Sequence, residues 1–420
     1  MNRMNERSLT ASPSIGARDV FGLYLHIPFC RTKCPYCDFN TYAGLERLIP
    51  GYLEALGRDL ALWGQILGRP PTTSVFIGGG TPSLLNVAQM DALMRSISES
   101  FDLQSGAEIT VEVNPDDVDK ARLIGFRNSG INRISVGIQA LDDPQLALLG
   151  RRHGLEGAVK ALLTIRDAGF ENVSADLMYG LPNQTVGMWE QTLCGLVELE
   201  PDHISAYCLT FEEGTPFEKM LMSGQIVEPD PDIAAEMYEL SEQTLRGSGY
   251  YGYEISNWSR PGFESRHNLT YWYNLPYLGV GPGAHSHIAQ HRFHSVLSPT
   301  EYILRVQSWN EPDPPNGGSP NQAFLERIPH VIEVEHISPS LALAETVIMT
   351  LRLREGIDRK GFQSRFNIDF NDVFCDVLPE MEELGLIEEF CSDDKMFTRL
   401  TSKGRLLGNQ VFSRLLGHLT

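Results

Sequence analysis

The sequence predicts an α/β fold: a partial (β/α)6 barrel, then an aromatic and Gly-rich extension, then a small C-terminal helical, winged-helix-like domain. From Val20 to about Thr210, short β-rich runs alternate with amphipathic stretches, which is typical of a mostly parallel sheet with crossover helices. Right-handed crossovers curl such a sheet toward a barrel. The composition becomes aromatic and Gly-rich over 250–283, and the chain ends in helical patterns around two strand-like runs.

The barrel strands are expected at 20–26, 74–78, 108–114, 132–139, 172–179 and 203–210. Apolar residues recur at three- and four-residue spacing in the helices expected at 87–101, 155–168 and 231–246. The C-terminal elements are expected as helices at 341–354, 372–384 and 403–416 and strands at 386–390 and 396–400. In barrels of this kind the site lies at the C-terminal ends of the strands, so motifs directly after a strand carry extra weight.

Four regions follow from these patterns. Residues 1–18 have no apolar run of the kind that a signal peptide needs, so we expect a disordered tail. The barrel core is expected at 19–250 and the extension at 251–330, with a Pro-, Gly- and Asn-rich loop at 312–321. The C-terminal domain is expected at 331–420.

Composition excludes several classes of protein. The 420-residue chain has 54 acidic and 34 basic residues, a net charge of −20, which disfavours nucleic acid as a partner. No apolar run approaches the ~20 residues that cross a bilayer, so an integral membrane protein is not expected. Seven cysteines, an odd number, argue against a disulfide-bonded secreted protein and indicate a reducing, cytoplasmic compartment.

Three cysteines crowd into a loop directly after the first predicted strand. Cys30, Cys34 and Cys37 form the pattern C-x-x-x-C-x-x-C. Cysteine thiolates hold iron–sulfur clusters, and three in one loop can ligate three irons of a [4Fe–4S] cluster and leave the fourth iron open. A zinc ion with His26 or a distant cysteine as fourth ligand, and free thiols that bind nothing, are the alternatives.

This motif, after the first strand of a βα sheet, resembles the radical S-adenosylmethionine (SAM) superfamily. The segment Tyr24-Leu-His-Ile-Pro-Phe-Cys30 is similar to the branch that contains oxygen-independent coproporphyrinogen III oxidases, and the likeness extends from Val20 to the C-terminus. The resemblance implies a [4Fe–4S] cluster whose open iron chelates SAM. It also implies that an electron from the cluster can cleave SAM to a 5′-deoxyadenosyl radical.

The resemblance implies a set of SAM contacts, which follow or lie near the predicted strand ends. They are Tyr24, Tyr36, Gly79, Gly80, Thr81, Glu112, Gln139, Arg151, Asp176 and Cys208. Structural explanations exist for several of them. A glycine run after a strand is also a tight turn, Arg151 and Asp176 are also candidates for structural ion pairs, and Tyr36 could serve packing alone.

Two features separate an oxidase from a haem chaperone. The motif of oxidases in this branch resembles C-x-x-x-C-x-x-C-x-C, with a fourth cysteine two positions after the third. Phe39 occupies that position here. This difference weakens the oxidase interpretation and argues against coproporphyrinogen turnover. His267, Asn268, Tyr271 and Trp272 form H-N-x-x-Y-W, which resembles a motif of haem chaperones in this branch. Histidine is a common axial ligand of haem iron. The alternative is structural: the two aromatic residues could pack in the core and the asparagine could lie in a turn.

The sequence therefore predicts a haem chaperone that binds a cluster, SAM and haem, and delivers haem to haem-requiring proteins. The alternative is a coproporphyrinogen III oxidase that forms protoporphyrinogen IX by SAM-dependent oxidative decarboxylation. No catalytic residue is assigned. An unidentified electron donor and a second copy of the chain are further candidate partners. A histidine group could supply a second haem ligand or form a solvated loop: His285, His287, His291 and His294.

Overall fold

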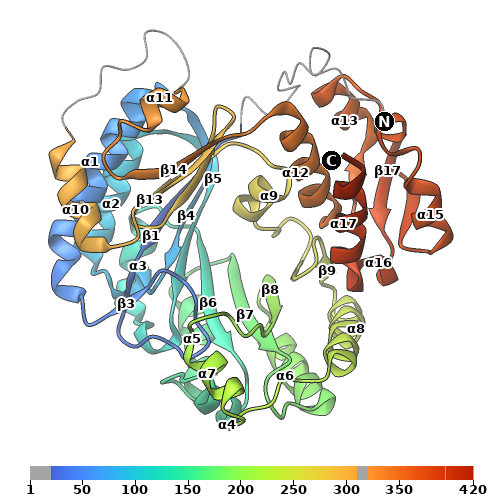
Figure 1. The fold of residues 1–420 in the computed structure, drawn as a ribbon. Helices are drawn as coiled ribbons and strands as arrows, with labels where there is room; N and C mark the ends of the chain where they lie inside the picture. Colours follow the sequence, from blue (N-terminus) through green and yellow to red (C-terminus); the bar gives the residue numbers. More distant parts are fainter. Residues whose placement is uncertain (1–19, 310–319, 393, 420) are drawn as a thin grey trace.

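The computed structural model describes residues 20–309, 320–392 and 394–419. They form a twelve-stranded sheet with helices packed against it and a separate small C-terminal unit (Figure 1). The strand order is β14-β13-β12-β11-β1-β4-β5-β6-β7-β8-β10-β9. The tail expected at 1–18 lies outside the described residues, as does most of the loop expected at 312–321. Within the described chain, no helix has both the length and the apolar character needed to cross a membrane.

All six predicted barrel strands are present and pair in parallel in chain order, which confirms the predicted α/β partial barrel. They are β1 (Gly22–Ile27), β4 (Pro71–Gly79), β5 (Asp102–Val113), β6 (Arg133–Gln139), β7 (Val173–Tyr179) and β8 (His203–Cys208). Side chains alternate between the two faces of each strand. One set therefore packs under the helices, and the other faces the barrel interior.

Helices cover the outer face of these strands. They are α1 (Ile49–Leu67), α2 (Val87–Ser100), α3 (Lys120–Asn128), α5 (Leu155–Asp167), α6 (Val186–Glu198) and α8 (Pro231–Gly247), which packs on α6. Two shorter helices, α4 (Asp143–Leu148) and α7 (Pro216–Met222), lie at the C-terminal end of the strands near Tyr36. Helix α2 illustrates how the sequence determines where a helix begins and which face it buries. Asn86 and Gln89 form a capping box at its first turn, and Leu93 and Ile97 lie on its buried face.

The extension contributes strands to both edges of the same sheet. Strands β9 (Tyr251–Gly252) and β10 (Asn257–Ser259) continue it beyond β8, whereas β11 (Tyr277–Val280) pairs in parallel with β1. Beyond β11 lie β12 (His285–Ile288), β13 (His291–Ser295) and β14 (Val331–His336), all antiparallel. The remaining elements are β2 (Phe29–Cys30), β3 (Tyr42–Ala43), α9 (Arg266–Trp272), α10 (Pro299–Ser308) and α11 (Gln322–Leu325).

The C-terminal unit has its own hydrophobic core. Its elements are α12 (Pro339–Leu351), β15 (Ile357–Asp358), α13 (Arg359–Phe366), α14 (Phe370–Phe374), α15 (Leu378–Glu383), β16 (Ile387–Ser392), β17 (Lys395–Leu400), α16 (Ser402–Leu406) and α17 (Gly408–Leu419). The prediction of a single helix at 372–384 is wrong, because α14 ends at Phe374 and a new helix, α15, begins at Leu378 with Pro379 in its first turn. The helix expected at 403–416 is likewise divided, since Leu407 leaves helical geometry between α16 and α17.

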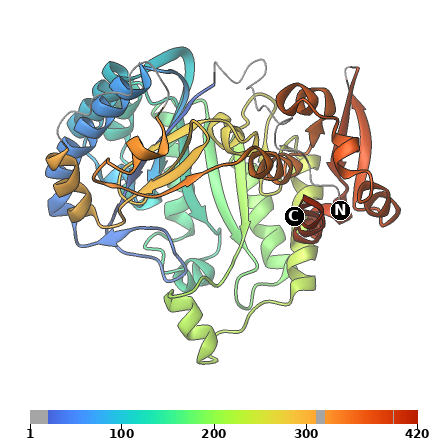
Figure 2. The ribbon, with the colours of Figure 1, turned by 45° about the horizontal axis from the view of Figure 1, so that its top comes forward.

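The C-terminal unit lies to one side of the barrel, beside α8 and α9, in both views (Figures 1 and 2). Helix α12 packs against α9, and Arg354 pairs with Glu242 of α8. The segment that carries the H-N-x-x-Y-W motif is thus placed between the barrel and the C-terminal unit.

Candidate functional site

A cavity of about 590 Å³ occupies the barrel interior and opens at the C-terminal ends of the strands. Its wall brings together the three motif cysteines and nine of the ten residues that the sequence placed near SAM. Those nine are Tyr36, Gly79, Gly80, Thr81, Glu112, Gln139, Arg151, Asp176 and Cys208. Tyr24 is not part of the wall: its hydroxyl lies 2.8 Å from Nδ1 of His26, and its ring lies beside Phe76.

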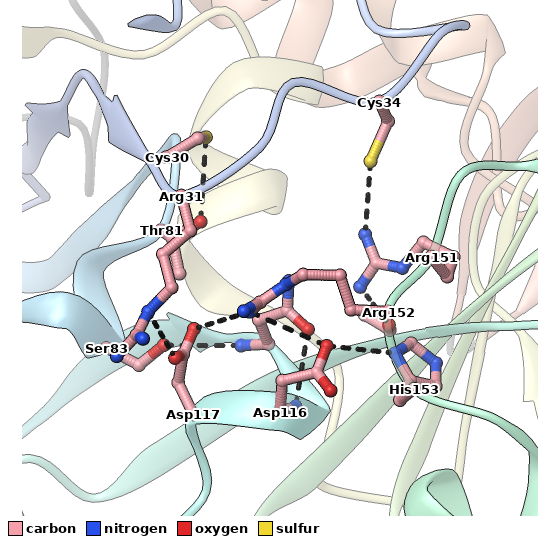
Figure 3. A network of polar contacts seen from close by, with 12 residues as sticks. Cys30, Arg31, Cys34, Thr81, Ser83, Asp116, Asp117, Arg151, Arg152 and His153 are labelled. Atoms are coloured by element: carbon pink, nitrogen blue, oxygen red, sulfur yellow. Dashed lines mark hydrogen bonds and ion pairs between the residues drawn. The ribbon is translucent and has the colours of Figure 1, made fainter. Parts of the chain in front are cut away.

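The cysteine loop begins at the end of β2 and hangs over the cavity. Cys30 is buried, whereas Cys34 and Cys37 are partly exposed to the cavity. The Thr81 hydroxyl lies 3.5 Å from Sγ of Cys30, and the Arg151 guanidinium lies 3.6 Å from Sγ of Cys34 (Figure 3). Burial raises the pKa of the Cys30 and Cys37 thiols, so these thiols stay protonated at neutral pH until a metal displaces the proton.

An ion-pair network that sequence analysis missed fixes this loop to the barrel (Figure 3). Arg31, next to Cys30, lies 3.1 Å from the buried carboxylate of Asp117. Arg152 lies 3.6 Å from Asp116 and 3.7 Å from Asp117, and His153 lies 3.8 Å from Asp116. The available signal was positional, because the two aspartates follow the third predicted strand directly and the arginine and histidine follow Arg151. Loop and strand ends are therefore held as one unit.

The donor set distinguishes a cluster from a zinc ion. Among the described residues, no three His, Cys, Asp or Glu side chains converge closely enough to hold one metal ion. His26 also has both ring nitrogens engaged, with Tyr24 at 2.8 Å and the Asn40 carbonyl at 2.9 Å. In a [4Fe–4S] cluster each cysteine binds a different iron, so the sulfurs need only face a common volume. Three thiols around one cavity fit that requirement.

The glycine run packs against the base of the cysteine loop. A Cβ on Gly80 would lie 2.6 Å from the carbonyl oxygen of Phe29 and 2.8 Å from that of Ile27. Gly79 has φ +109°, and a Cβ there would lie 2.5 Å from the His26 ring. Only glycine permits this close approach of the end of β4 to the loop. A structural reason for the run thus exists beside its place in the cavity wall.

Gly80→Ala is expected to lower the free energy of unfolding by roughly 1–3 kcal/mol, because overpacking forces the backbone to move. The same movement should reduce the iron retained by the purified protein. Gly51→Ala is the matched control, since nothing lies within 4 Å of a Cβ there, and it should leave both quantities unchanged or raise stability slightly. Urea denaturation and iron analysis of the two variants measure the difference, and equal behaviour would contradict this packing role.

Two carboxyl groups face the barrel interior. Glu112 accepts a 2.8 Å hydrogen bond from the Gly79 amide, and burial raises its pKa to about 7. Asp176 accepts the Ser135 hydroxyl at 3.0 Å, and burial raises its pKa as well. Glu112 can therefore hold or release a proton near neutral pH, and burial shifts Asp176 toward its protonated form.

Glu112 should make stability fall as pH rises. Its carboxyl binds its proton more tightly in the folded chain than in the unfolded chain, so the stabilisation present below pH 4.5 is lost as pH passes through about 7. Between pH 5 and pH 8 the loss is at most about 2 kcal/mol, because water in the cavity screens part of it. Urea denaturation should show a smaller pH-dependent loss in Glu112→Gln than in the native sequence. Parallel curves for the two proteins would contradict this assignment.

The H-N-x-x-Y-W motif forms helix α9. His267 is buried, with Nδ1 3.0 Å from the Ser74 hydroxyl and Nε2 2.8 Å from the Tyr271 hydroxyl. Burial lowers the pKa of His267 to about 3, so this imidazole is neutral. The Asn268 side chain lines the cavity, whereas the Trp272 ring lies against Arg352 of the C-terminal unit at 4.8 Å. The four motif residues are thus divided between two environments.

The histidine group of the extension lies apart from the cavity wall. Its members occupy the hairpin of β12 and β13, where the rings of His285 and His294 lie 4.7 Å apart. His294 also lies 3.1 Å from Glu333. None of the four histidines is among the residues that line the cavity.

Comparison with known proteins identifies the family. Residues 24–193 match the radical SAM superfamily model, and residues 337–407 match the HemN C-terminal domain model. The chain is 35% identical over 400 residues to the heme chaperone HemW of Bacillus subtilis, covering 94% of this chain and 99% of that protein. It is 38% identical over 340 residues to the heme chaperone HemW of Synechocystis, covering 80% of this chain and 78% of that protein.

The fold has a counterpart among solved structures. Coproporphyrinogen III oxidase HemN from Escherichia coli superposes with a TM-score of 0.75, covering 98% of this chain and 92% of that chain. At 24% identity this likeness shows the fold. Membership of the superfamily implies a [4Fe–4S] cluster and SAM. From its similarity to HemW proteins along nearly its whole length, the chain belongs to the HemW family of the radical SAM superfamily.

Proposed function

We propose that this protein is a haem chaperone that binds a [4Fe–4S] cluster, SAM and haem, and delivers haem to haem-requiring proteins. The observation that carries the proposal is its similarity to curated heme chaperones, which spans 94% of this chain and 99% of the Bacillus subtilis protein. Phe39 supports the same proposal. Its side chain is 59% exposed at the cavity wall, where oxidases of this branch are expected to carry a fourth cysteine.

In this proposal Cys30, Cys34 and Cys37 hold the cluster, and the strand-end residues of the cavity wall hold SAM. When bound, such a cluster could supply an electron for the cleavage of SAM. Arg151 positions the loop, because it contacts Sγ of Cys34 and donates a 2.8 Å hydrogen bond to the Gly137 carbonyl of β6. Glu112 and Asp176 offer oxygen acceptors inside the cavity, where hydrogen-bond donors of SAM can be satisfied.

The haem ligand in this proposal is His267, and its surroundings set a condition on binding. Both of its ring nitrogens are hydrogen-bonded, so ligation of iron requires His267 to give up its bond to Ser74 or to Tyr271. The carboxylate of Glu108 accepts the amides of Arg266 and His267 at 3.1 Å each and holds the start of α9 in place. Because α12 packs on the same helix, movement of the C-terminal unit is a route to opening the site.

The test is an anaerobic reaction with SAM, a reductant and coproporphyrinogen III, run beside a haem titration of the same preparation. The proposal predicts saturable haem binding at one site per chain and no multiple-turnover formation of protoporphyrinogen IX. Sustained protoporphyrinogen formation would contradict the proposal and establish the oxidase instead.

A further inference from the structure

The cavity extends far below the strand ends, to the opposite end of strand β6. The inward-facing residues Arg133, Ser135, Gly137 and Gln139 all line it. Gln139 is the last residue of β6 and Arg133 the first, six steps of ~3.3 Å away, so the cavity follows the strand for roughly 20 Å. The cysteines and the glycine run lie at the Gln139 end. The floor at the Arg133 end has no assigned role.

Arg133 is a buried cation without a partner. The side chain is only 2% exposed, its Nε is buried without a hydrogen bond, and no ion pair joins it to any described residue. Taking a guanidinium out of water costs several kcal/mol when nothing compensates it. Buried charges in proteins are usually paired, so an unpaired one that lines a cavity indicates a missing anionic ligand.

The neighbouring carboxylates are engaged elsewhere. Asp176 accepts a hydrogen bond from the Ser135 hydroxyl, and Glu112 accepts one from the Gly79 amide. Glu108 accepts hydrogen bonds from the first amides of α9. Asp176 is close enough for the charge of Arg133 to lower its pKa, but no hydrogen bond joins them. The floor therefore keeps a positive centre that these acids do not neutralise by direct contact.

The rest of the floor is neutral and polar. His203 is bonded at both ring nitrogens, to Ser174 at 2.8 Å and Tyr253 at 2.9 Å, and burial together with the charge of Arg133 keeps its pKa well below the usual value. The Asn268 amide lines the cavity and makes no hydrogen bond to a described side chain or carbonyl. The charge of Arg133 reaches His267, the residue before Asn268, and lowers its pKa, so both residues belong to the same end of the cavity. A guanidinium and a free amide donor on one cavity wall match the two oxygens of a carboxylate.

We propose that Arg133, assisted by Asn268, forms a carboxylate-binding subsite at the floor of the barrel, separate from the residues expected to hold SAM. The ligand is the carboxylate of a short alkanoic acid arm. Two sources share this chemistry: a propionate arm of a tetrapyrrole and a free small carboxylic acid. The subsite follows from the floor residues alone and does not depend on haem being the cargo.

Sodium propionate is the probe, and thermal unfolding of the full-length protein is the readout. The native sequence should show a saturable rise in Tm with propionate, beyond the effect of sodium chloride at equal ionic strength. Arg133→Met should abolish the rise without lowering Tm in the absence of propionate, because it removes an unpaired buried charge. Arg127→Met, at an exposed position of α3, is the matched control and should keep the full rise.

Asn268→Ala keeps the proposal testable if Arg133→Met does not fold. It should weaken propionate binding, so the half-saturating propionate concentration should rise severalfold. The subsite is overturned if propionate gives the native sequence no specific rise, or if the rise survives Arg133→Met or is unchanged in Asn268→Ala. Competition then separates the sources, because a tetrapyrrole source predicts that haem, but not its dimethyl ester, displaces propionate. Failure of haem to bind at all would contradict the chaperone function and leave the propionate result standing.

Discussion

Cys34→Ser is expected to remove the cluster: iron and acid-labile sulfide should fall from about four of each per chain to near zero after anaerobic reconstitution. Three thiolates hold the three ligated irons in this proposal, and a serine oxygen is a poor substitute for a soft thiolate ligand. SAM binding should be lost together with the cluster, because the open iron disappears.

Cys375→Ser is the matched control for that experiment, since Cys375 is an exposed cysteine in the C-terminal unit. It should keep the full iron and sulfide content. Equal content in both variants would contradict ligation by the cysteine loop. One zinc per chain and no sulfide in the native protein would instead support a zinc site. Such a site would require the cysteine loop and His26 to rearrange.

Haem affinity is expected to respond in opposite ways to two changes at α9. His267→Ala should weaken haem binding at least tenfold, because it removes the proposed iron ligand. Tyr271→Phe removes only the hydrogen bond that occupies Nε2 of His267, so it should keep or increase the affinity. A Soret titration at matched protein concentrations measures both.

The pair also tests the packing explanation of the motif. If His267 only packs in the protein interior, Tyr271→Phe and His267→Ala should both lower the free energy of unfolding. Each variant leaves a buried polar group without its partner, at a cost of about 1–3 kcal/mol. Urea denaturation of both variants identifies that case. Parallel losses of stability with unchanged haem binding would remove His267 from the haem site.

The parallel strands and the cavity wall were predictable because their signals are local. A short apolar run followed by Gly79 or by Glu112 marks both a strand and its end, and barrel topology then places those ends together. The cysteine spacing is likewise contained in a few residues. These features depend little on how distant parts of the chain pack.

The rest depends on long-range contacts that spacing does not encode. The strands of the extension have two to five residues, and β12 and β13 are rich in histidine, so no alternation marked them. The bond of His267 to Ser74 follows from the position of α9 against the barrel, whereas its bond to Tyr271 is a local contact one helical turn away. Arg133 was unremarkable in the sequence because its isolation depends on which neighbours are already paired.

The most direct test of the account is haem transfer. The native protein is loaded with haem, freed of excess haem by gel filtration and mixed with a haem-free acceptor protein whose haem complex has a distinct Soret band. The account predicts one haem retained per chain and its stoichiometric appearance on the acceptor, with no retention by His267→Ala. A chain that emerges without haem, or that holds haem without giving it to the acceptor, would contradict a haem chaperone.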